Sequence, residues 1–279
     1  MKRAAGFNSE RTYGIEIEFN LASNHQNLNL REVGFQVARL MNEAGVTCEF
    51  ESYNHNVRSY WKIVTDASCG LELVSPPLKG DEGFRQIQVA CNALHRAGAK
   101  VDRRCGLHVH HDAHDFTVNS FKALYGIYVR FEAAIDELMP MSRRGSSNHY
   151  CQSPRRSLTD IEACSQIRDI TTRLYYDRYV KLNCQSYGRY GTVEFRQHSG
   201  TIEADKIVNW IVLTQAMVEK ATKGTVVLKQ GANDWFNFKK VIRAYAWMGA
   251  DENLQTAIKF YNERRIQLAR QAGVETTTD

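Results

Sequence analysis

Four short runs of alternating apolar and titratable residues constrain the fold of this chain most strongly. Successive side chains of a strand point to opposite faces, so each run has one apolar face and one polar face. A single run is equally typical of an ordinary solvated strand, but the repetition favours a shared polar site. The runs are Tyr13–Phe19, Gly70–Pro77, Gly106–His110 and Gly191–Thr201.

The rest of the sequence predicts helices mixed with these strands. Apolar residues at helical spacing, with capping residues and terminal glycines, mark most of the helices. Neither a regular strand–helix alternation nor an all-strand pattern is present, so we expect an α+β fold with helices on one face of a mostly antiparallel sheet. The expected helices are 30–44, 81–97, 117–138, 158–176, 204–222, 235–248 and 254–272, and the additional strands are 46–53, 60–65 and 178–183.

Composition sets broad limits on the class of protein. The 279 residues, of which 43% are hydrophobic and 24% charged, are typical of a globular protein, and the net charge of +5 mildly favours anionic ligands such as nucleotides. Seven cysteines without a CxxC pair indicate reduced thiols. We find neither a signal peptide nor a membrane-spanning segment, and therefore expect a cytoplasmic protein.

Carboxylates on the polar faces indicate a metal site. Glu16 and Glu18 share one face of their strand, and Glu72 and Glu194 lie on similar strands. Several carboxylates gathered together repel one another unless a cation lies between them. Carboxylate oxygens suit Mg²⁺ or Mn²⁺, and Mg²⁺ commonly keeps waters and substrate phosphates as its other ligands. A magnesium–nucleotide site follows as the hypothesis.

Histidines and arginines near these carboxylates extend the hypothesis. His108 and His110 also share a face; such a pair is often structural, but an imidazole beside carboxylates can complete a metal shell or hold a phosphate oxygen. Arg196, two residues after Glu194, can place a guanidinium beside a metal-bound phosphate, and Arg189 can do the same from the adjoining loop.

A polar, basic segment at 140–157 is long enough for a functional loop, although a merely solvated loop would look the same. Its arginines are Arg143, Arg144, Arg155 and Arg156.

Taken in order, these motifs resemble the amidoligase family, which belongs with the carboxylate–amine ligases and is distantly related to glutamine synthetase and glutamate–cysteine ligase. The resemblance implies a glutamine-synthetase-like sheet curved around a Mg–ATP site, an acyl-phosphate intermediate, and its capture by an amine. The motifs are Gly14-x-Glu16-x-Glu18, Asp66-x-Ser68, Glu72–Pro77, Gly106–His110, Arg178–Asn183, Thr192–Thr201 and Ile207-x-x-Trp210-Ile211.

The resemblance also implies roles for individual residues. Glu16, Glu18, Glu72 and Glu194 are expected metal ligands, with His108 a ligand or phosphate contact, and Arg196, Glu194 and Glu16 are the expected catalytic set. The expected nucleotide contacts are His108, His110, Arg189 and Arg196, and the expected substrate contacts are Asp66, Ser68, Arg143 and Arg144. Residues 1–222 would form the catalytic domain, and 223–279, which match no motif, a helical extension packed on it.

Two other functions stay open on the sequence alone. A metal-dependent hydrolase could use the His-x-His pair and the carboxylates to activate water. A nucleotide-binding or nucleic-acid-binding module without chemistry would fit the basic loop and its nearby tyrosines. For a ligase we expect ATP and Mg²⁺ or Mn²⁺ as cofactors, and an acid and an amine as substrates, each an amino acid, peptide or protein. Neither a membrane nor nucleic acid is required.

Overall fold

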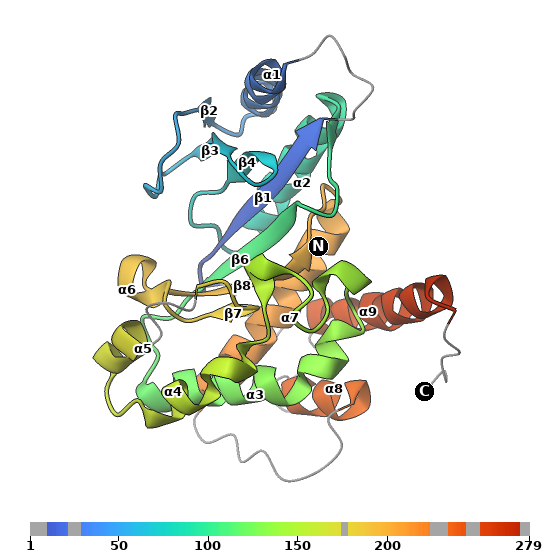
Figure 1. The fold of residues 1–279 in the computed structure, drawn as a ribbon. Helices are drawn as coiled ribbons and strands as arrows, with labels where there is room; N and C mark the ends of the chain where they lie inside the picture. The colour runs from blue at the N-terminus through green and yellow to red at the C-terminus, as the bar shows by residue number, and fades with distance from the viewer. Residues whose placement is uncertain (1–9, 22–28, 174–177, 224–233, 244–251, 274–279) are drawn as a thin grey trace. The chain divides into compact units, whose positions relative to one another are not determined.

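The computed structural model describes residues 10–21, 29–173, 178–223, 234–243 and 252–273 (Figure 1). The chain divides into two compact units. The N-terminal unit contains Ser9–His110 and His198–Val208, and the C-terminal unit contains His111–Gln197 and Asn209–Asp279.

A sheet of short strands forms the centre of the N-terminal unit. Its strands are β1 (Tyr13–Leu21), β2 (Cys48–Phe50), β3 (Trp61–Asp66), β4 (Gly70–Val74), β5 (Ala99–Lys100) and β6 (Gly106–Asp112), which continues into the C-terminal unit. They follow the order β2-β3-β4-β1-β6, with β5 also paired to β1. Pairing is antiparallel for β1 with β4 and β5 and for β3 with β4, whereas β2 and β3 are parallel.

The alternation of side chains along these strands places the apolar residues together. Ile15, Ile17, Leu71 and Leu73 are at most 1% exposed. The register opposes Glu18 to Glu72 and Ile17 to Leu73, so the two glutamates lie on one face and the two apolar residues on the other.

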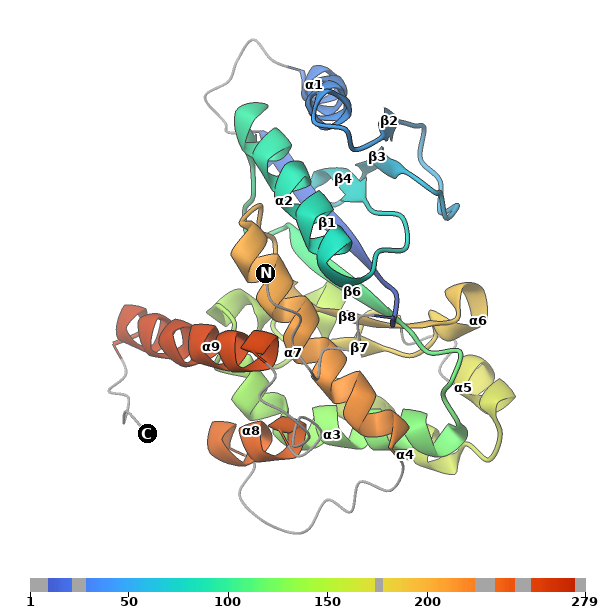
Figure 2. The ribbon, with the colours of Figure 1, turned by 180° about the vertical axis from the view of Figure 1, so that it is seen from behind.

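Two amphipathic helices, α1 (Leu30–Glu43) and α2 (Gly80–Arg96), cover the apolar face. A carbon added to Gly34 of α1 would lie 3.2 Å from the side chain of Leu71, and Phe84 of α2 packs its ring against Tyr13. In both views α2 runs along β1, on one face of this strand (Figures 1 and 2). The glutamate-bearing face is therefore the one that these helices leave uncovered.

The C-terminal unit is mainly helical. Its elements are α3 (Val118–Asp136), three 3-10 helices η1 (Met141–Arg143), η2 (His149–Cys151) and η3 (Pro154–Ser157), α4 (Leu158–Ala163), α5 (Ile167–Arg173), α6 (Tyr187–Tyr190), α8 (Trp235–Arg243) and α9 (Glu252–Gln271). Strand β7 (Leu182–Asn183) pairs antiparallel with β8 (Thr192–Ser199), whose last two residues belong to the N-terminal unit. Helix α7 (Ala204–Thr222) likewise begins in the N-terminal unit and continues here.

The mixture of helices and strands and the mostly antiparallel pairing of the strands confirm the predicted fold class. Four local predictions were wrong, the first being the strand expected at 46–53, which is a strand only at Cys48–Phe50. The expected loop at 140–157 forms short 3-10 helices, the expected strand at 178–183 is a strand only at Leu182–Asn183, and the helix expected at 158–176 ends at Ala163, because Cys164 has extended backbone, and resumes at Ile167. The ends of two expected helices, at 174–176 and 244–248, lie outside the described residues.

All seven cysteines are free and buried, which agrees with the expectation of reduced thiols. Among the helices that the structure describes, none has the length and apolarity needed to cross a membrane. The division of the chain at residue 222 stays a prediction.

Candidate functional site

The uncovered face of the N-terminal sheet gathers four of the residues that the sequence singled out. Glu16 and Glu18 come from β1, Glu72 from β4 and His108 from β6. The side chains of Glu18 and His108 are only 10% and 6% exposed, and that of Glu16 is 26% exposed. Carboxylates so poorly solvated require compensating charges or hydrogen bonds.

Histidines provide part of that compensation. His108 Nδ1 lies 2.9 Å from Glu16 Oε2, and its Nε2 lies 3.6 Å from Glu18 Oε1. His110 Nε2 lies 3.4 Å from Glu16 Oε1. The backbone N–H of Gly106 donates to Glu18 Oε2 at 2.6 Å. His108 and His110 therefore share a face with the carboxylates, as the period-two pattern predicted.

The two imidazoles also determine the charge of Glu16. Burial opposes ionisation of this carboxyl, but hydrogen bonds from His108 and His110, with their charges, outweigh it and hold the pKa of Glu16 well below its usual range. Glu16 is thus an anion at neutral pH and is available as a metal ligand.

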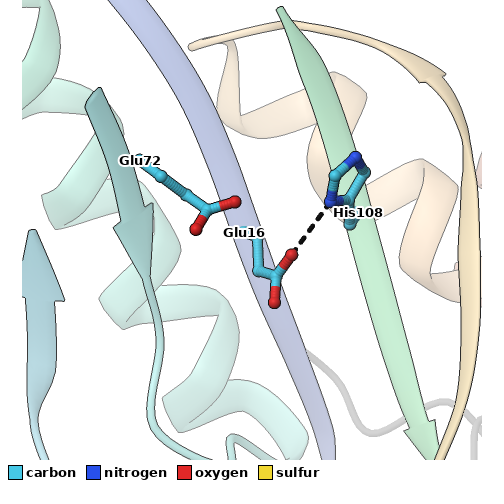
Figure 3. A group of neighbouring side chains, drawn as sticks. All are labelled: Glu16, Glu72 and His108. Carbon is cyan, nitrogen blue, oxygen red and sulfur yellow. Dashed lines mark hydrogen bonds and ion pairs between the residues drawn. The ribbon is translucent and has the colours of Figure 1, made fainter. Parts of the chain in front are cut away.

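Three of these side chains offer ligand atoms that converge. One carboxylate oxygen each from Glu16 and Glu72 and one ring nitrogen of His108 lie within 4.8 Å of one another (Figure 3). Two carboxylates and an imidazole, drawn from three neighbouring strands, form a donor set that suits Mg²⁺, Mn²⁺ or Zn²⁺. The residues therefore fit a divalent cation, with Glu18 directly opposite Glu72 in the register.

Strand β8 carries a second charged cluster, within the C-terminal unit. Glu194, which is 4% exposed, accepts hydrogen bonds from Asn183 Nδ2 at 2.7 Å and from the guanidinium of Arg196. Asn183 and Glu194 are register partners of β7 and β8, which explains why their side chains meet. Arg196 also points its Nε towards the carbonyl oxygen of Tyr150 at 3.4 Å.

One aromatic ring lies near the Arg196 guanidinium. The guanidinium lies 6.0 Å from the ring centroid of Tyr179, whose other neighbours include Tyr150, His149 and Arg178. A guanidinium over an aromatic face gains a modest cation–π attraction, so the Tyr179 ring helps to orient Arg196.

The other expected site residues have structural partners of their own. Asp66 Oδ1 accepts hydrogen bonds from the backbone N–H groups of Ser68 and Cys69, at 2.7 and 3.0 Å, and from the Ser68 hydroxyl. These bonds hold the β3–β4 turn and outweigh burial, so the pKa of Asp66 is lowered. A contact of Asp66 or Ser68 with substrate stays a prediction.

The expected arginines lie in the C-terminal unit and differ in exposure. Arg143 is buried, at 3% exposed, and Arg144 donates from Nε to the carbonyl oxygen of Met139 at 2.8 Å. Arg189 is exposed at the end of α6, with its guanidinium over the ring of Tyr190. Of these three, Arg189 presents the most accessible guanidinium, and their contacts with nucleotide or substrate stay predictions.

Sequence reasoning assigned no role to Asn183 or Lys62. Lys62 is 3% exposed, and its register partner Val74 is also the partner of Glu16, so Lys62 and Glu16 share the charged face. Its Nζ donates to oxygens of Asn54 and Asn56, at 2.7 to 3.1 Å. A lysine between apolar residues of a strand could have indicated a polar site in the sequence. The face of the sheet on which Lys62 lies depends on the β3–β4 register, which the sequence alone does not give.

Comparison with known families decides the identity of this chain. A family model described as "Putative amidoligase enzyme" matches residues 9–218. The chain belongs to the amidoligase family. The matched range contains every site residue described above, and the predicted family is confirmed.

Among solved structures, the fold is similar to a chain described as "Crystal structure of the complex between Prokaryotic Ubiquitin-like Protein Pup and its Ligase PafA". The TM-score is 0.47 at 10% sequence identity, and the match covers 96% of this amidoligase chain. The chain spans 65% of the length of that solved chain. A search of curated proteins gives no match.

Proposed function

We propose that this amidoligase-family protein joins a carboxylate to an amine at the expense of ATP, through an acyl-phosphate intermediate. The observation that carries the proposal is the convergence of Glu16, Glu72 and His108 on the uncovered face of the sheet. A carboxylate is a poor electrophile, and phosphorylation supplies it with a good leaving group. The protein must therefore position two anions and reduce their repulsion.

In this proposal Glu16, Glu18 and Glu72, with His108, hold Mg²⁺ or Mn²⁺, which would screen the phosphates of ATP. Hydrogen bonds from His108 and His110 keep Glu16 anionic, which favours cation binding. Glu18 is fixed by the backbone N–H of Gly106, so its carboxylate is oriented before any ligand arrives.

Strand β8 would supply the remaining charges. Glu194 would be a further metal ligand, as the family resemblance implies, and Arg196 would stabilise the charge that develops on the transferred γ-phosphate. His110 and Arg189 would contact the nucleotide, and substrate contacts would come from Asp66, Ser68, Arg143 and Arg144. No side-chain nucleophile is needed, in keeping with the seven buried thiols.

The direct test is to incubate the protein with MgATP and a small-molecule extract supplemented with peptides. We expect release of ADP and phosphate that depends on Mg²⁺, and products whose mass equals an acid plus an amine minus water. Release of AMP instead of ADP would refute the acyl-phosphate step.

The observed donor set also suits a metal-dependent hydrolase, because two carboxylates and an imidazole can hold a zinc ion that activates water. Turnover of the same extract without any nucleotide would favour that function over the ligase.

Two variants test the roles given to β8. Glu194→Gln and Arg196→Ala are each expected to abolish ATP-dependent turnover while the protein stays folded by circular dichroism and thermal melting. Glu43→Gln serves as a control, because Glu43 is half exposed on α1 and pairs with Arg39. Turnover that persists in either β8 variant would remove that residue from the mechanism.

A further inference from the structure

The C-terminal unit contains a fully buried lysine to which the proposed chemistry gives no role. Lys181 is 0% exposed, and its Nζ donates to Glu132 Oε1 at 2.7 Å and to Asp136 Oδ1 at 2.6 Å, both on α3. Buried ion pairs contribute little net stability, because desolvation offsets their attraction. In some proteins they fix one geometry over others, which raises the question of what Lys181 fixes.

Lys181 is connected to Arg196 by two routes. In the first route, the backbone N–H of Arg196 donates to the carbonyl oxygen of Lys181 at 2.9 Å. In the second, Asp136 Oδ1 accepts hydrogen bonds both from Lys181 Nζ and from the side-chain amide of Gln197, the residue after Arg196. A displacement of Lys181 would therefore reach β8 through the backbone and through a side chain.

Hydrogen bonds hold both the nitrogen and the oxygen of the Gln197 side-chain amide. Gln197 is 0% exposed, its Nε2 also donates to the carbonyl oxygen of Arg143 at 3.2 Å, and its Oε1 accepts from the hydroxyl of Tyr128. Phe195, on the other side of Arg196, is also 0% exposed and packs against the rings of Tyr128 and His111. The backbone on both sides of Arg196 is thus fixed.

The Arg196 guanidinium is paired with the carboxylate of Glu194 on the same strand, so its place depends on the position of that strand. The Arg196 side chain is 15% exposed, and its bond to the Tyr150 carbonyl oxygen is long, at 3.4 Å. A long side chain of this kind has many rotamers, so the place its head occupies depends on where its backbone is held.

We propose that Lys181 is a positioning residue for Arg196, acting through the carbonyl bond and through Asp136 and Gln197. The inference rests on the proposed function, in which Arg196 stabilises the transferred phosphoryl group. Misplacement of a reacting group by about 1 Å can cost on the order of 100-fold in rate, so a small shift of β8 would suffice to be measured.

The test compares three variants with the wild-type protein. Lys181→Met removes the charge but keeps the length, and Lys181→Arg restores the charge. Arg155→Ala is the matched control, because Arg155 lies 4.0 Å from the same Glu132 but donates hydrogen bonds to Val129 of α3 and to Ser153 rather than to β8. The readouts are amide hydrogen exchange of a peptide spanning 192–199, and kcat and KM for MgATP in the extract assay.

For Lys181→Met we expect faster exchange within 192–199 and a fall in kcat of about 100-fold, with KM for ATP nearly unchanged. Lys181→Arg should recover much of the rate, and Arg155→Ala should behave as the wild type. Wild-type exchange or wild-type kcat in a folded Lys181→Met protein would overturn the inference, as would an equal loss in Arg155→Ala.

If Lys181→Met does not fold, Gln197→Met tests the side-chain route without leaving a buried charge unpaired. It should shift both readouts in the same direction, and unchanged values would overturn the inference. Wild-type protein that releases no phosphate from ATP would refute the proposed function and the inference with it. An active wild type with a fully active Lys181→Met variant would refute the inference alone.

Discussion

Replacing Glu72 by glutamine should stabilise the protein without metal and weaken its stabilisation by divalent cations. Glu72 is directly opposite Glu18 across the β1–β4 pair, and one of its oxygens lies within 4.8 Å of a Glu16 ligand atom. Like charges directly opposite each other in a sheet destabilise it by up to about 1 kcal/mol. Glutamine keeps the shape of the side chain and removes that repulsion, but it is a poor metal ligand.

The two effects differ enough in size to be separated. Relief of repulsion raises the melting temperature by about 2–4 °C per kcal/mol for a domain of roughly this length, and the expected gain in chelator is therefore a few degrees. A cation present at 100 times its dissociation constant stabilises the folded state by about 2.7 kcal/mol. The wild-type protein should thus gain roughly 5–10 °C on adding the metal, and Glu72→Gln much less.

Differential scanning calorimetry in EDTA and across a titration of MgCl₂ or MnCl₂ measures both quantities. Glu43→Gln, on the exposed surface of α1, should follow the wild type in both conditions. The reasoning is refuted if Glu72→Gln keeps the full metal-induced shift, or if it melts below the wild type in EDTA.

Two further predictions concern other parts of the N-terminal unit. Hydrogen bonds from Arg58 hold the pKa of Glu51 at about 2, below its ordinary 4.5. The stability contributed by this ion pair should therefore be complete above about pH 4.5 and be lost as the pH falls towards 2. NMR of the Arg58 Nε–H group follows the ion pair, and its loss already at pH 4.5 would contradict the prediction. Gly83→Ala should lower the free energy of unfolding, measured in urea, by about 1–3 kcal/mol, because the added carbon would lie 2.2 Å from the Tyr13 hydroxyl. Gly14→Ala should lower it much less, because the nearest neighbour of the added carbon lies at 3.8 Å. Equal losses would show that helix α2 moves to accommodate the added carbon at Gly83.

The charged face was predictable because the period-two pattern is local. Glu16, Glu18, Glu72 and His108 each sit in a run whose alternate residues are apolar, and no knowledge of partners is needed to place a side chain on one face of its strand. The bounds of β4 follow from the same pattern, which begins at Gly70 and stops before Pro76.

The features that escaped prediction depend on contacts far apart in sequence. Strand β2 ends at Phe50, and the carboxylate of the next residue, Glu51, accepts hydrogen bonds from Arg58, Tyr60 and Asn54 in the segment that follows. Lys62 joins the charged face only through the β3–β4 register. Arg143 was expected to be a substrate contact in a basic loop, and the structure places it buried in the short helix η1. Local composition does not record such pairings.

The pairing of Glu194 with Arg196 makes the two β8 variants unequal as tests. Glu194 is 4% exposed, and a buried carboxylate needs compensation that Arg196 and Asn183 supply. Arg196→Ala therefore removes the proposed phosphate contact and also leaves a buried anion with less compensation, so the protein should stay folded through the bond from Asn183 but melt at a lower temperature. Glu194→Gln keeps the side-chain shape and an oxygen that can accept from Asn183, so it perturbs folding less. A loss of turnover in Glu194→Gln thus reports on chemistry more directly, and the loss in Arg196→Ala must be read beside its melting curve.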